Sequence, residues 1–450
     1  MKKRSSPQNA ATDGAHRQPA GETAAVTIEA AIETMGAQGD GVALSGAAKV
    51  FIPFTLPGET VRAEITGAKG EALAILQASP DRVTPLCRHF GICGGCSLQH
   101  WQDAPYAEWK TGLVKAALAR EGLDAPLEGL KTYPVASRRR AAFKACKDGG
   151  RVRLGFNAAQ SHELIDLEEC PILLPDLASA LPHLKAALAD ALPDRTEAKV
   201  HLTAASNGLD CGIEAPPLRA ERQAQLTGRL SAAGVIRATW NGGIVFLLAA
   251  PFVLAGGVPV MLPQGAFLQA AEACERDMAA FIDEALAAAK TAKGPVCDLF
   301  AGLGAFTFAC ARKAPVAAYE ANAGAIAALN EAVKGARGLK PVRAVRRDLF
   351  RNPLGPMELK AFSAAVADPP REGAEAQCHA LAASNIGTVV MLSCNPVTFA
   401  RDAAILAAGG FSLVRLAAFD QFRFSPHVEI AGAFMRAVSK KGGISPALKR

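Results

Sequence analysis

The feature that most constrains the fold is a regular alternation of apolar runs and alanine-rich segments from about residue 290 to residue 437. The apolar runs have the composition of buried strands, and segments such as ANAGAIAALNEAVKGAR between them read as helices. Alternation of this kind is typical of βαβ units, so we predict an α/β fold with a doubly wound, mainly parallel sheet. The predicted strands are PVCDLF, PVAAYE, PVRAVRRD, FSAAVADPP and TVVMLSC.

The first of these strands runs into a glycine turn, CDLFAGLGAF at residues 297–306. Gly302 and Gly304 would let the backbone turn tightly and approach a ligand. Glu320 ends the next strand 22 residues after Asp298, where a carboxylate can bind both hydroxyls of a ribose. An adenosine-containing cofactor is therefore favoured over a plain tight turn. With no third glycine and no phosphate-loop lysine, S-adenosylmethionine fits better than a dinucleotide or ATP.

Two further acids follow predicted strands. Asp348 would lie near the adenine, although a surface turn explains it nearly as well. Asp368, in ADPPREG at residues 367–373, is fixed by two prolines at the carboxyl edge of the sheet. Such D-P-P loops in methyltransferases hold the reacting group of the substrate, and a simple proline-rich turn is the alternative.

A thiol ends the last predicted strand, where VVMLSCNPVTFARD places Cys394 before Asn395 and the helix-opening Pro396. Open α/β sheets bind their ligands at this edge. A thiolate that adds to C6 of uracil turns C5 into a nucleophile for a methyl sulfonium, and a base must then remove the C5 proton. An inert cysteine at a strand end is the alternative.

The segments SCNP, DPPREG and DLFAGLGAF resemble motifs of the RNA uracil-C5 methyltransferase family, and the resemblance extends over nearly the whole chain. It implies a Rossmann-like class I methyltransferase domain, with Cys394 as the nucleophile and Glu429, in SPHVE, as the base. Independently of the resemblance, Arg371 is expected to help position Asp368 or the base, and a uridine inside a folded RNA stem would have to be flipped into the pocket. Cofactor-binding positions implied by the resemblance are Gln269, Phe300, Ala305, Glu320, Asp348 and Asp368.

Two positions depart from the family pattern. Ala305 stands where the family often has Asn, and Ala271 replaces the Asn of its F-x-Q-x-N element. Both changes remove a polar side chain near the expected cofactor, so they bear on its affinity more than on the chemistry.

Four of the eleven cysteines form a separate pattern. Cys87, Cys93 and Cys96 have Cys-x5-Cys-x2-Cys spacing, and Cys170 lies far downstream. Thiolates on such a loop can bind a soft metal centre, and the spacing alone leaves a four-cysteine zinc site open. The family resemblance implies a [4Fe–4S] cluster, whose role is expected to be structural, with a redox role left open. A radical-methyl site would have Cys-x3-Cys-x2-Cys spacing instead.

Two histidines of the same loop, His89 and His100, are expected to be loop or RNA-contacting residues rather than ligands. The remaining cysteines outside this group, apart from Cys394, are expected to be buried structural thiols.

Changes in composition predict the domain boundaries. Residues 1–24 read as a disordered basic tail. Residues 25–83 contain short strands such as VFIPF and TVRAEI between glycine-rich turns, which predict an OB-like β-barrel or another small β domain. The family resemblance implies a TRAM-type, RNA-binding barrel. Residues 84–258 would form a mixed α/β iron–sulfur domain, and residues 259–450 the methyltransferase domain.

Charge and hydropathy indicate the partner and the compartment. The net charge is +7, and residues 131–153 carry eight Lys or Arg against one Asp. Such a surface suits a polyanion such as structured RNA, although a solvated face is the alternative. The sequence has no apolar run long enough to span a membrane, and no apolar stretch of a signal peptide near residue 1, so a cytoplasmic protein is expected. No protein partner is implied.

These observations predict an enzyme that transfers a methyl group from S-adenosylmethionine to C5 of a uridine in structured RNA. The resemblance implies 23S ribosomal RNA as the substrate, because members of the family with both the barrel and the cluster act mostly on ribosomal RNA. The alternatives are the same chemistry on transfer RNA, a non-catalytic RNA-binding protein, and an amino-group methyltransferase that would not need Cys394.

Overall fold

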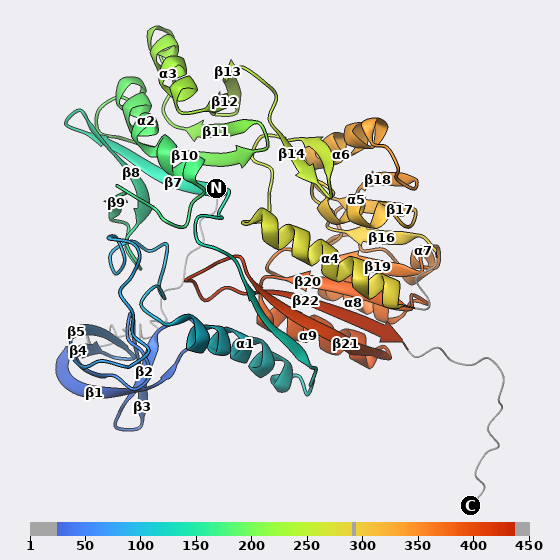
Figure 1. Cartoon of the computed structure of the whole chain (residues 1–450), viewed down its shortest axis with the longest axis horizontal. Helices are drawn as coiled ribbons and strands as arrows, with labels where there is room; N and C mark the ends of the chain where they lie inside the picture. The colour runs from blue at the N-terminus through green and yellow to red at the C-terminus, as the bar shows by residue number, and fades with distance from the viewer. Residues whose placement is uncertain (1–24, 290–293, 437–450) are drawn as a thin grey trace, which may run out of the picture. The chain divides into compact units, whose positions relative to one another are not determined.

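The computed structural model describes residues 25–289 and 294–436 (Figure 1). Within these residues the chain forms two compact units, the first ending at Pro80 and the second beginning at Asp81. The short turn Ala37–Gly39 belongs to the second unit. The predicted tail at residues 1–24 and the basic residues beyond 436 lie outside the described residues.

The first unit is a closed five-stranded barrel, which confirms the predicted N-terminal β-barrel. Side chains of β4 alternate between the barrel core and the exterior, as a half-buried strand requires. The buried Glu59 carboxylate accepts hydrogen bonds from the backbone N–H groups of Leu56 and Ser79 at 2.8 and 3.3 Å, which fixes the barrel's connections. The strands are β1 (Val26–Met35), β2 (Gly41–Ser45), β3 (Ala48–Ile52), β4 (Thr60–Thr66) and β5 (Lys69–Gln77).

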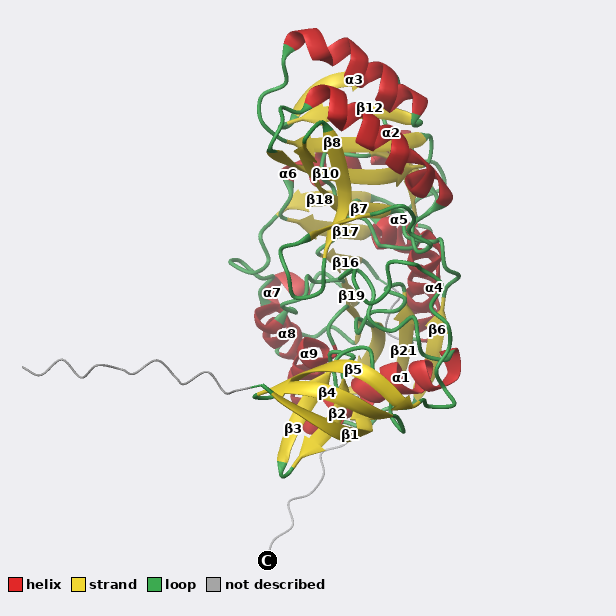
Figure 2. Cartoon of the chain, turned by 90° about the vertical axis from the view of Figure 1, so that its left-hand side faces the viewer, coloured by secondary structure: helices red, strands yellow, loops and turns green. Residues whose placement is uncertain are grey.

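The second unit contains a seven-stranded sheet in the order β13-β12-β11-β10-β7-β8-β9. Its neighbouring strands are antiparallel except for β11 and β12. Helices α2 (Pro175–Ala191) and α3 (Ala220–Ala232) pack on one face (Figure 2). The strands are β7 (Arg140–Asp148), β8 (Arg151–Asn157), β9 (Leu164–Asp166), β10 (Thr196–Ala205), β11 (Gly208–Glu214), β12 (Val235–Trp240) and β13 (Gly243–Leu247).

An eight-stranded sheet follows, in the order β18-β17-β16-β19-β20-β22-β21-β6. Its first five strands are parallel and correspond to the five strands predicted from the sequence. The antiparallel β22 is inserted between β20 and β21. The strands are β6 (Leu127–Thr132), β16 (Val296–Leu299), β17 (Val316–Glu320), β18 (Val342–Arg346), β19 (Ala364–Ala367), β20 (Thr388–Ser393), β21 (Phe411–Asp420) and β22 (Glu429–Arg436).

The eight-stranded sheet extends beyond the range predicted for the methyltransferase domain. Strand β6 lies within residues 84–258 but pairs in parallel with β21. Two short strands, β14 (Phe252–Ala255) and β15 (Val258–Met261), form a separate hairpin near the predicted boundary. The boundary at residue 258 therefore does not separate all strands of one sheet from those of the other.

Helices cover both faces of this sheet, as the doubly wound prediction requires. In β20, Val389 and Met391 belong to a core cluster with α1, α8 and α9, whereas Val390 and Leu392 belong to one with α4 and α5. The strand is therefore apolar throughout because both of its faces are buried. The helices are α1 (Asp103–Arg120), α4 (Glu272–Ala288), α5 (Ala305–Ala311), α6 (Ala323–Gly335), α7 (Pro356–Leu359), α8 (Glu375–Ala382) and α9 (Pro396–Ala408).

Among the described helices none combines the length and the apolar character needed to cross a membrane. The strand order reverses between β16 and β19, and ligands of open α/β sheets bind at the carboxyl ends of the strands at such a point.

Candidate active site

Cys394 lies at this edge, directly after β20 and before α9. Asn395 caps the helix, because its side chain accepts a hydrogen bond from the Val397 N–H at 3.1 Å. Its amide also donates to the Arg371 carbonyl at 3.2 Å, and Thr398 Oγ1 donates to the same oxygen at 3.2 Å. The loop that carries the thiol is thus tied to the D-P-P loop.

Asp368 begins the D-P-P loop, directly after β19. Its Oδ2 accepts a hydrogen bond from Gln269 Nε2 at 2.9 Å. Burial, followed by the carboxylates of Glu429 and Asp298, raises the pKa of Asp368 well above its ordinary value. The predicted site residues Gln269 and Asp368 are therefore in direct contact.

Glu429 is the first residue of β22 and is buried. Because β22 is antiparallel to β20, with Ser393 opposite Ile430, it starts at the edge where β20 ends. The geometry thus brings Glu429 to the same end of the sheet as Cys394. Burial raises the pKa of Glu429 to about 7, and the hydrogen bond from Gln421 opposes that rise.

A chain of side-chain hydrogen bonds joins the two acids. Gln421 Nε2 donates to Glu429 Oε2 at 2.8 Å and to Gln269 Oε1 at 2.7 Å. Gln269 in turn donates to Asp368. The order of the side chains is Asp368–Gln269–Gln421–Glu429. The sequence does not reveal Gln421, because this residue belongs to no recognisable motif.

The thiol lies in an environment that favours its protonated form in the absence of a cation. Burial raises the pKa of Cys394 to about 11, followed by the effect of the Glu429 and Asp368 carboxylates, and Arg371 opposes the rise. A positively charged sulfonium bound nearby would lower this pKa by favouring the thiolate.

The glycine turn after β16 has the geometry of a ligand-binding loop. Gly302 and Gly304 have φ angles of 53° and 88°, and Phe300 has a φ of 62°. A bulky residue in this left-handed region is strained, and such strain clusters at functional sites. The Phe300 ring packs on Phe350 with 5.3 Å between ring centroids.

Glu320 ends β17, as predicted, and its carboxylate is held against the glycine turn. Oε2 accepts from the Gly302 N–H at 3.0 Å, and Oε1 accepts from the Asn322 N–H at 2.7 Å. Each oxygen retains a second lone pair that can accept a hydrogen bond from a ligand hydroxyl.

Asp348 lies in the turn after β18. Its Oδ1 accepts from the N–H groups of Phe350 and Arg351 at 3.0 and 3.2 Å. The residue thus shapes the loop that carries Phe350, and Phe350 contacts Phe300.

The two departures from the family pattern fall at structurally different places. Ala305 is the first residue of α5, next to Gly304. Ala271 is fully buried and immediately precedes α4, and its N–H donates to Gln421 Oε1 at 3.4 Å. A side-chain amide is therefore present beside Ala271, and it comes from Gln421, directly after β21.

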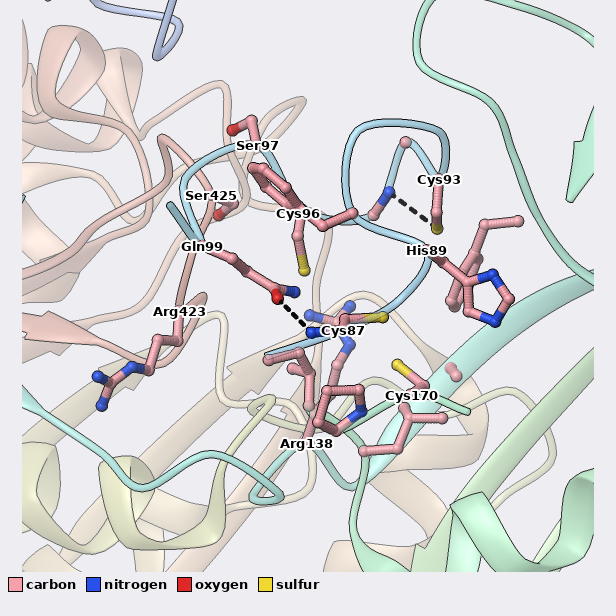
Figure 3. A pocket seen from close by; sticks show the side chains of 18 of the residues that line it. Cys87, His89, Cys93, Cys96, Ser97, Gln99, Arg138, Cys170, Arg423 and Ser425 are labelled. Carbon is pink, nitrogen blue, oxygen red and sulfur yellow. Dashed lines mark hydrogen bonds between the residues drawn. The ribbon is translucent and has the colours of Figure 1, made fainter. Parts of the chain in front are cut away.

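The four cysteines outside the sheet edge line one pocket of about 430 Å³ (Figure 3). Cys87, Cys93 and Cys96 come from one loop, and Cys170 comes from the segment before α2. Their side chains point toward one another across the pocket. Phe90, Phe156 and Leu167 supply apolar walls.

Burial is the main cause of raised thiol pKa values in this pocket. For Cys96 the pKa rises to about 12, with further contributions from Cys170, Cys93 and Cys87. Such a set needs a cation to hold it as thiolates, which suits a soft metal centre. In residues 25–289 and 294–436 no three Cys, His, Asp or Glu side chains are arranged as ligands of a single metal ion.

The loop that carries three of the thiols is anchored on several sides. The Cys87 N–H donates to Gln99 Oε1 at 3.0 Å, and the Gly94 N–H donates to the Asn157 carbonyl at 2.9 Å. The buried His89 accepts from the Glu168 N–H at 3.0 Å through Nε2. His89 and His100 are both buried residues of this loop, in agreement with the first of the two roles expected for them.

The basic segment 138–140 is only partly a surface. Arg139 is buried in an ion pair with Glu275, and its Nε donates to the Gln269 carbonyl at 2.9 Å. The Arg140 guanidinium lies 4.4 Å from the centre of the Phe267 ring. Part of the positive charge counted in the sequence therefore braces Gln269.

A buried ion pair also lies near Glu429, and no sequence motif reveals it. Lys110 Nζ contacts Asp420 Oδ1 at 2.5 Å with neither side chain exposed, and it donates to the His427 carbonyl at 2.6 Å. Tyr106 donates to Asp420 Oδ2 at 2.8 Å and accepts from the Phe424 N–H at 2.9 Å. Helix α1 thus fixes the loop between β21 and β22. The only sequence signal was a lysine on an otherwise buried helical stripe.

Comparisons with known proteins agree with this arrangement. Residues 260–438 match the family model described as tRNA (Uracil-5-)-methyltransferase. A protein of Brucella suis described as an uncharacterized RNA methyltransferase is 43% identical over 412 residues, which cover 90% of this chain and 97% of the relative. The 23S rRNA (uracil(1939)-C(5))-methyltransferase of Halomonas elongata is 33% identical over 435 residues, covering 89% of this chain and 88% of that protein.

The fold also matches a solved structure. The tRNA (uracil-54, C5)-methyltransferase of Pyrococcus abyssi, in complex with S-adenosyl-L-homocysteine, aligns with a TM-score of 0.71 and 20% identity. The alignment covers 91% of this chain and all of that one. Together with the sequence relatives, these findings show that the chain belongs to the RNA uracil-C5 methyltransferase family and is an S-adenosylmethionine-dependent enzyme.

Proposed function

We propose that this enzyme methylates C5 of one uridine in 23S ribosomal RNA, with Cys394 as nucleophile and Glu429 as base. The observation that carries the proposal is the hydrogen-bonded chain from Asp368 to Glu429 at the sheet edge where Cys394 lies. Two buried acids, Asp368 and Glu429, thus lie at the same sheet edge as the Cys394 thiol. A thiol and a base are the groups that addition to uracil and removal of the C5 proton need.

The proposed steps follow from the chemistry of uracil. The Cys394 thiolate forms a bond to C6, and the electron pair of the 5,6-double bond becomes an enolate. C5 then attacks the methyl group of S-adenosylmethionine, and S-adenosylhomocysteine leaves. Glu429 removes the proton from C5, the double bond re-forms, and the Cys394 thiolate is expelled. The near-neutral pKa of Glu429 suits a base that must be ionised at physiological pH.

The methyl donor is proposed to bind over the glycine turn. Glu320 would accept hydrogen bonds from the ribose, Phe300 and Asp348 would lie beside the adenine, and Ala305 would border the same loop. Gln269 and Asp368 would face the reacting end. The support is that Phe300, Ala305, Glu320, Asp348 and Asp368 lie at or after the carboxyl ends of β16, β17, β18 and β19. Gln269 lies before α4 and reaches the same edge through its hydrogen bond to Asp368.

The four-thiol pocket is proposed to hold a [4Fe–4S] cluster, ligated by Cys87, Cys93, Cys96 and Cys170. Four soft donors line a single pocket, which suits a soft metal centre, and the family resemblance favours a [4Fe–4S] cluster over zinc. When bound, the cluster would crosslink the 87–96 loop to the segment before α2, so its proposed role is structural.

Ribosomal rather than transfer RNA is proposed as the substrate because the Halomonas relative named for 23S rRNA is 33% identical over most of this chain. The likeness to the Pyrococcus tRNA enzyme, at 20% identity, concerns the fold. The barrel would bind RNA, residues 84–258 would carry the cluster, and the enzyme would act in the cytoplasm. No protein partner is proposed.

Nucleoside mass spectrometry of RNA from a deletion strain tests the proposal. Loss of 5-methyluridine from 23S rRNA is expected, with restoration by the wild-type gene and not by a Cys394→Ala gene. Loss from transfer RNA alone would support the second candidate instead. Unchanged 5-methyluridine in both RNAs would contradict the proposed substrate.

A further inference from the structure

We propose that Gln421 is a positioning residue for the proton-removal step, a role that rests on the proposed function of Glu429. Gln421 is the residue after the end of β21 and is 5% exposed. Its side chain links Glu429, the proposed base, to Gln269 and to the backbone of Ala270 and Ala271.

The orientation of the Gln421 amide is fixed from one side by the backbone. Its Oε1 accepts from the N–H of Ala270 at 2.8 Å and from the N–H of Ala271 at 3.4 Å. Because an oxygen must face these two donors, the NH₂ group must face the opposite way. The assignment of oxygen and nitrogen therefore follows from main-chain geometry.

The NH₂ group then has two acceptors, Gln269 Oε1 at 2.7 Å and Glu429 Oε2 at 2.8 Å. Both of its N–H bonds are used, so rotation of the amide would lose hydrogen bonds at both ends. A hydrogen bond to a carboxylate also stabilises the ionised form, which is the form that can accept the C5 proton. Gln421 thus orients the Glu429 carboxylate and opposes the rise in its pKa that burial causes.

The backbone at Gln421 is held by a separate group. The preceding Asp420 is paired with Lys110 and accepts from Tyr106, both on α1. Lys110 also binds the carbonyl of His427, two residues before Glu429. Both ends of the 421–428 loop are therefore attached to one helix, and Gln421 starts from a fixed position.

The test measures turnover and the covalent enzyme–RNA intermediate with unmodified substrate RNA and saturating S-adenosylmethionine. Gln421→Met keeps the length of the side chain and removes the amide. Turnover is expected to fall about 10- to 100-fold, the equivalent of one hydrogen bond to a charged group. The denaturation-resistant complex should rise above the wild-type level, because addition and methyl transfer continue while proton removal is slow.

Gln377→Met is the matched control. Gln377 is a second buried glutamine, and its amide binds only the backbone of Leu354, at 2.8 and 3.2 Å, in the contacts described for it. Its replacement should lower thermal stability in the same way as Gln421→Met but leave the complex at the wild-type level. If Gln421→Met does not fold, Gln421→Asn replaces it, since the shorter amide cannot span Ala270 and Glu429.

The outcomes separate the two proposals. Slow turnover with more complex in Gln421→Met supports the positioning role. Slow turnover without more complex, or turnover within about twofold of wild type, overturns it when Glu429→Gln does accumulate complex. If Glu429→Gln accumulates none, the assignment of Glu429 as base fails, and the inference for Gln421 fails with it.

Discussion

The sheet edge with Cys394 and the pocket with four cysteines use the same atom, sulfur, in opposite ways. Cys394 stands alone among carboxylates, and main-chain strand pairing places it. Cys87, Cys93, Cys96 and Cys170 stand together on loops, and side-chain and loop hydrogen bonds place them. A single thiol beside acids suits transient bonding to carbon, and several converging thiols suit lasting bonding to metal.

The largest expected effect is that of Cys394→Ala. Removing the nucleophile should lower turnover by on the order of 10⁴-fold or more while RNA binding persists. Cys146→Ala, in the seven-stranded sheet, should retain wild-type turnover. Methyl incorporation and filter binding measure the two properties. Turnover of Cys394→Ala within tenfold of wild type would contradict the proposal that Cys394 is the nucleophile.

The second prediction concerns the pH dependence of the edge. Burial raises the pKa of Glu429 to about 7, so the carboxylate loses its ability to accept a proton as the pH falls below that value. Turnover should therefore decline from pH 8 to pH 6. Glu429→Gln should cost about 10²- to 10⁴-fold at pH 8. Its decline toward pH 6 should be smaller than that of the wild type, because only the Cys394 thiol then contributes to it. A wild-type profile that is flat from pH 6 to pH 8 would contradict the assignment.

The third prediction is that the ionised Glu429 carboxylate lowers the free energy of unfolding. Its folded-state pKa is raised from an ordinary 4.5 to about 7, so protonation stabilises the fold. That contribution is fully present below about pH 4.5 and is lost as the pH rises through about 7. Glu429→Gln should therefore raise the free energy of unfolding at pH 8, by up to about 3 kcal/mol. Urea titrations at pH 8 and pH 5 should show the gain shrinking at the lower pH.

The fourth prediction addresses the thiol pocket. Cys170→Ser should abolish iron binding by anaerobically purified protein, because one of the four proposed ligands is lost. Turnover should fall less than in Cys394→Ala, since the pocket is assigned a structural role. Cys394→Ala should keep its full iron content. Iron retained in Cys170→Ser, measured by elemental analysis, would exclude the proposed ligand set.

The smallest expected effect separates helix capping from loop positioning. Asn395→Ala and Asn322→Ala each remove a side chain that caps a helix, α9 and α6 respectively. Each should cost about 1 kcal/mol of stability. Only Asn395 also binds the Arg371 carbonyl, so only Asn395→Ala should reduce turnover, by about fivefold. Equal turnover in the two variants would show that the cap alone matters.

Local patterns predicted much of this molecule. The five parallel strands and the barrel are confirmed, because buried parallel strands are apolar throughout and barrel strands alternate. The positions of Cys394 and Asp368 followed from the rule that strand ends meet at one edge. Gln421 and Lys110 could not be predicted, since their partners lie far away in the sequence and neither belongs to a motif.

The placement of β6 was missed for a related reason. Its residues, LEGLKT, carry two charges and are mostly exposed, so they lack the apolar signal of the other strands. The basic segment 138–140 misled in the opposite direction, because a count of charges does not reveal that Arg139 pairs with Glu275. The pairing of β6 with β21 and of Arg139 with Glu275 joins residues far apart in the sequence, and local composition does not reveal such contacts.

The reversed direction of β22 has a consequence for variation among relatives. Cys394 and Glu429, the proposed nucleophile and base, lie next to the paired residues Ser393 and Ile430, and residues 395–428 form the excursion between them. Insertions on the far side of that excursion would leave the reacting pair undisturbed. A one-residue slip of β22 would instead turn the Glu429 carboxylate to the opposite side of the sheet. The register between β20 and β22 is therefore expected to vary least among relatives.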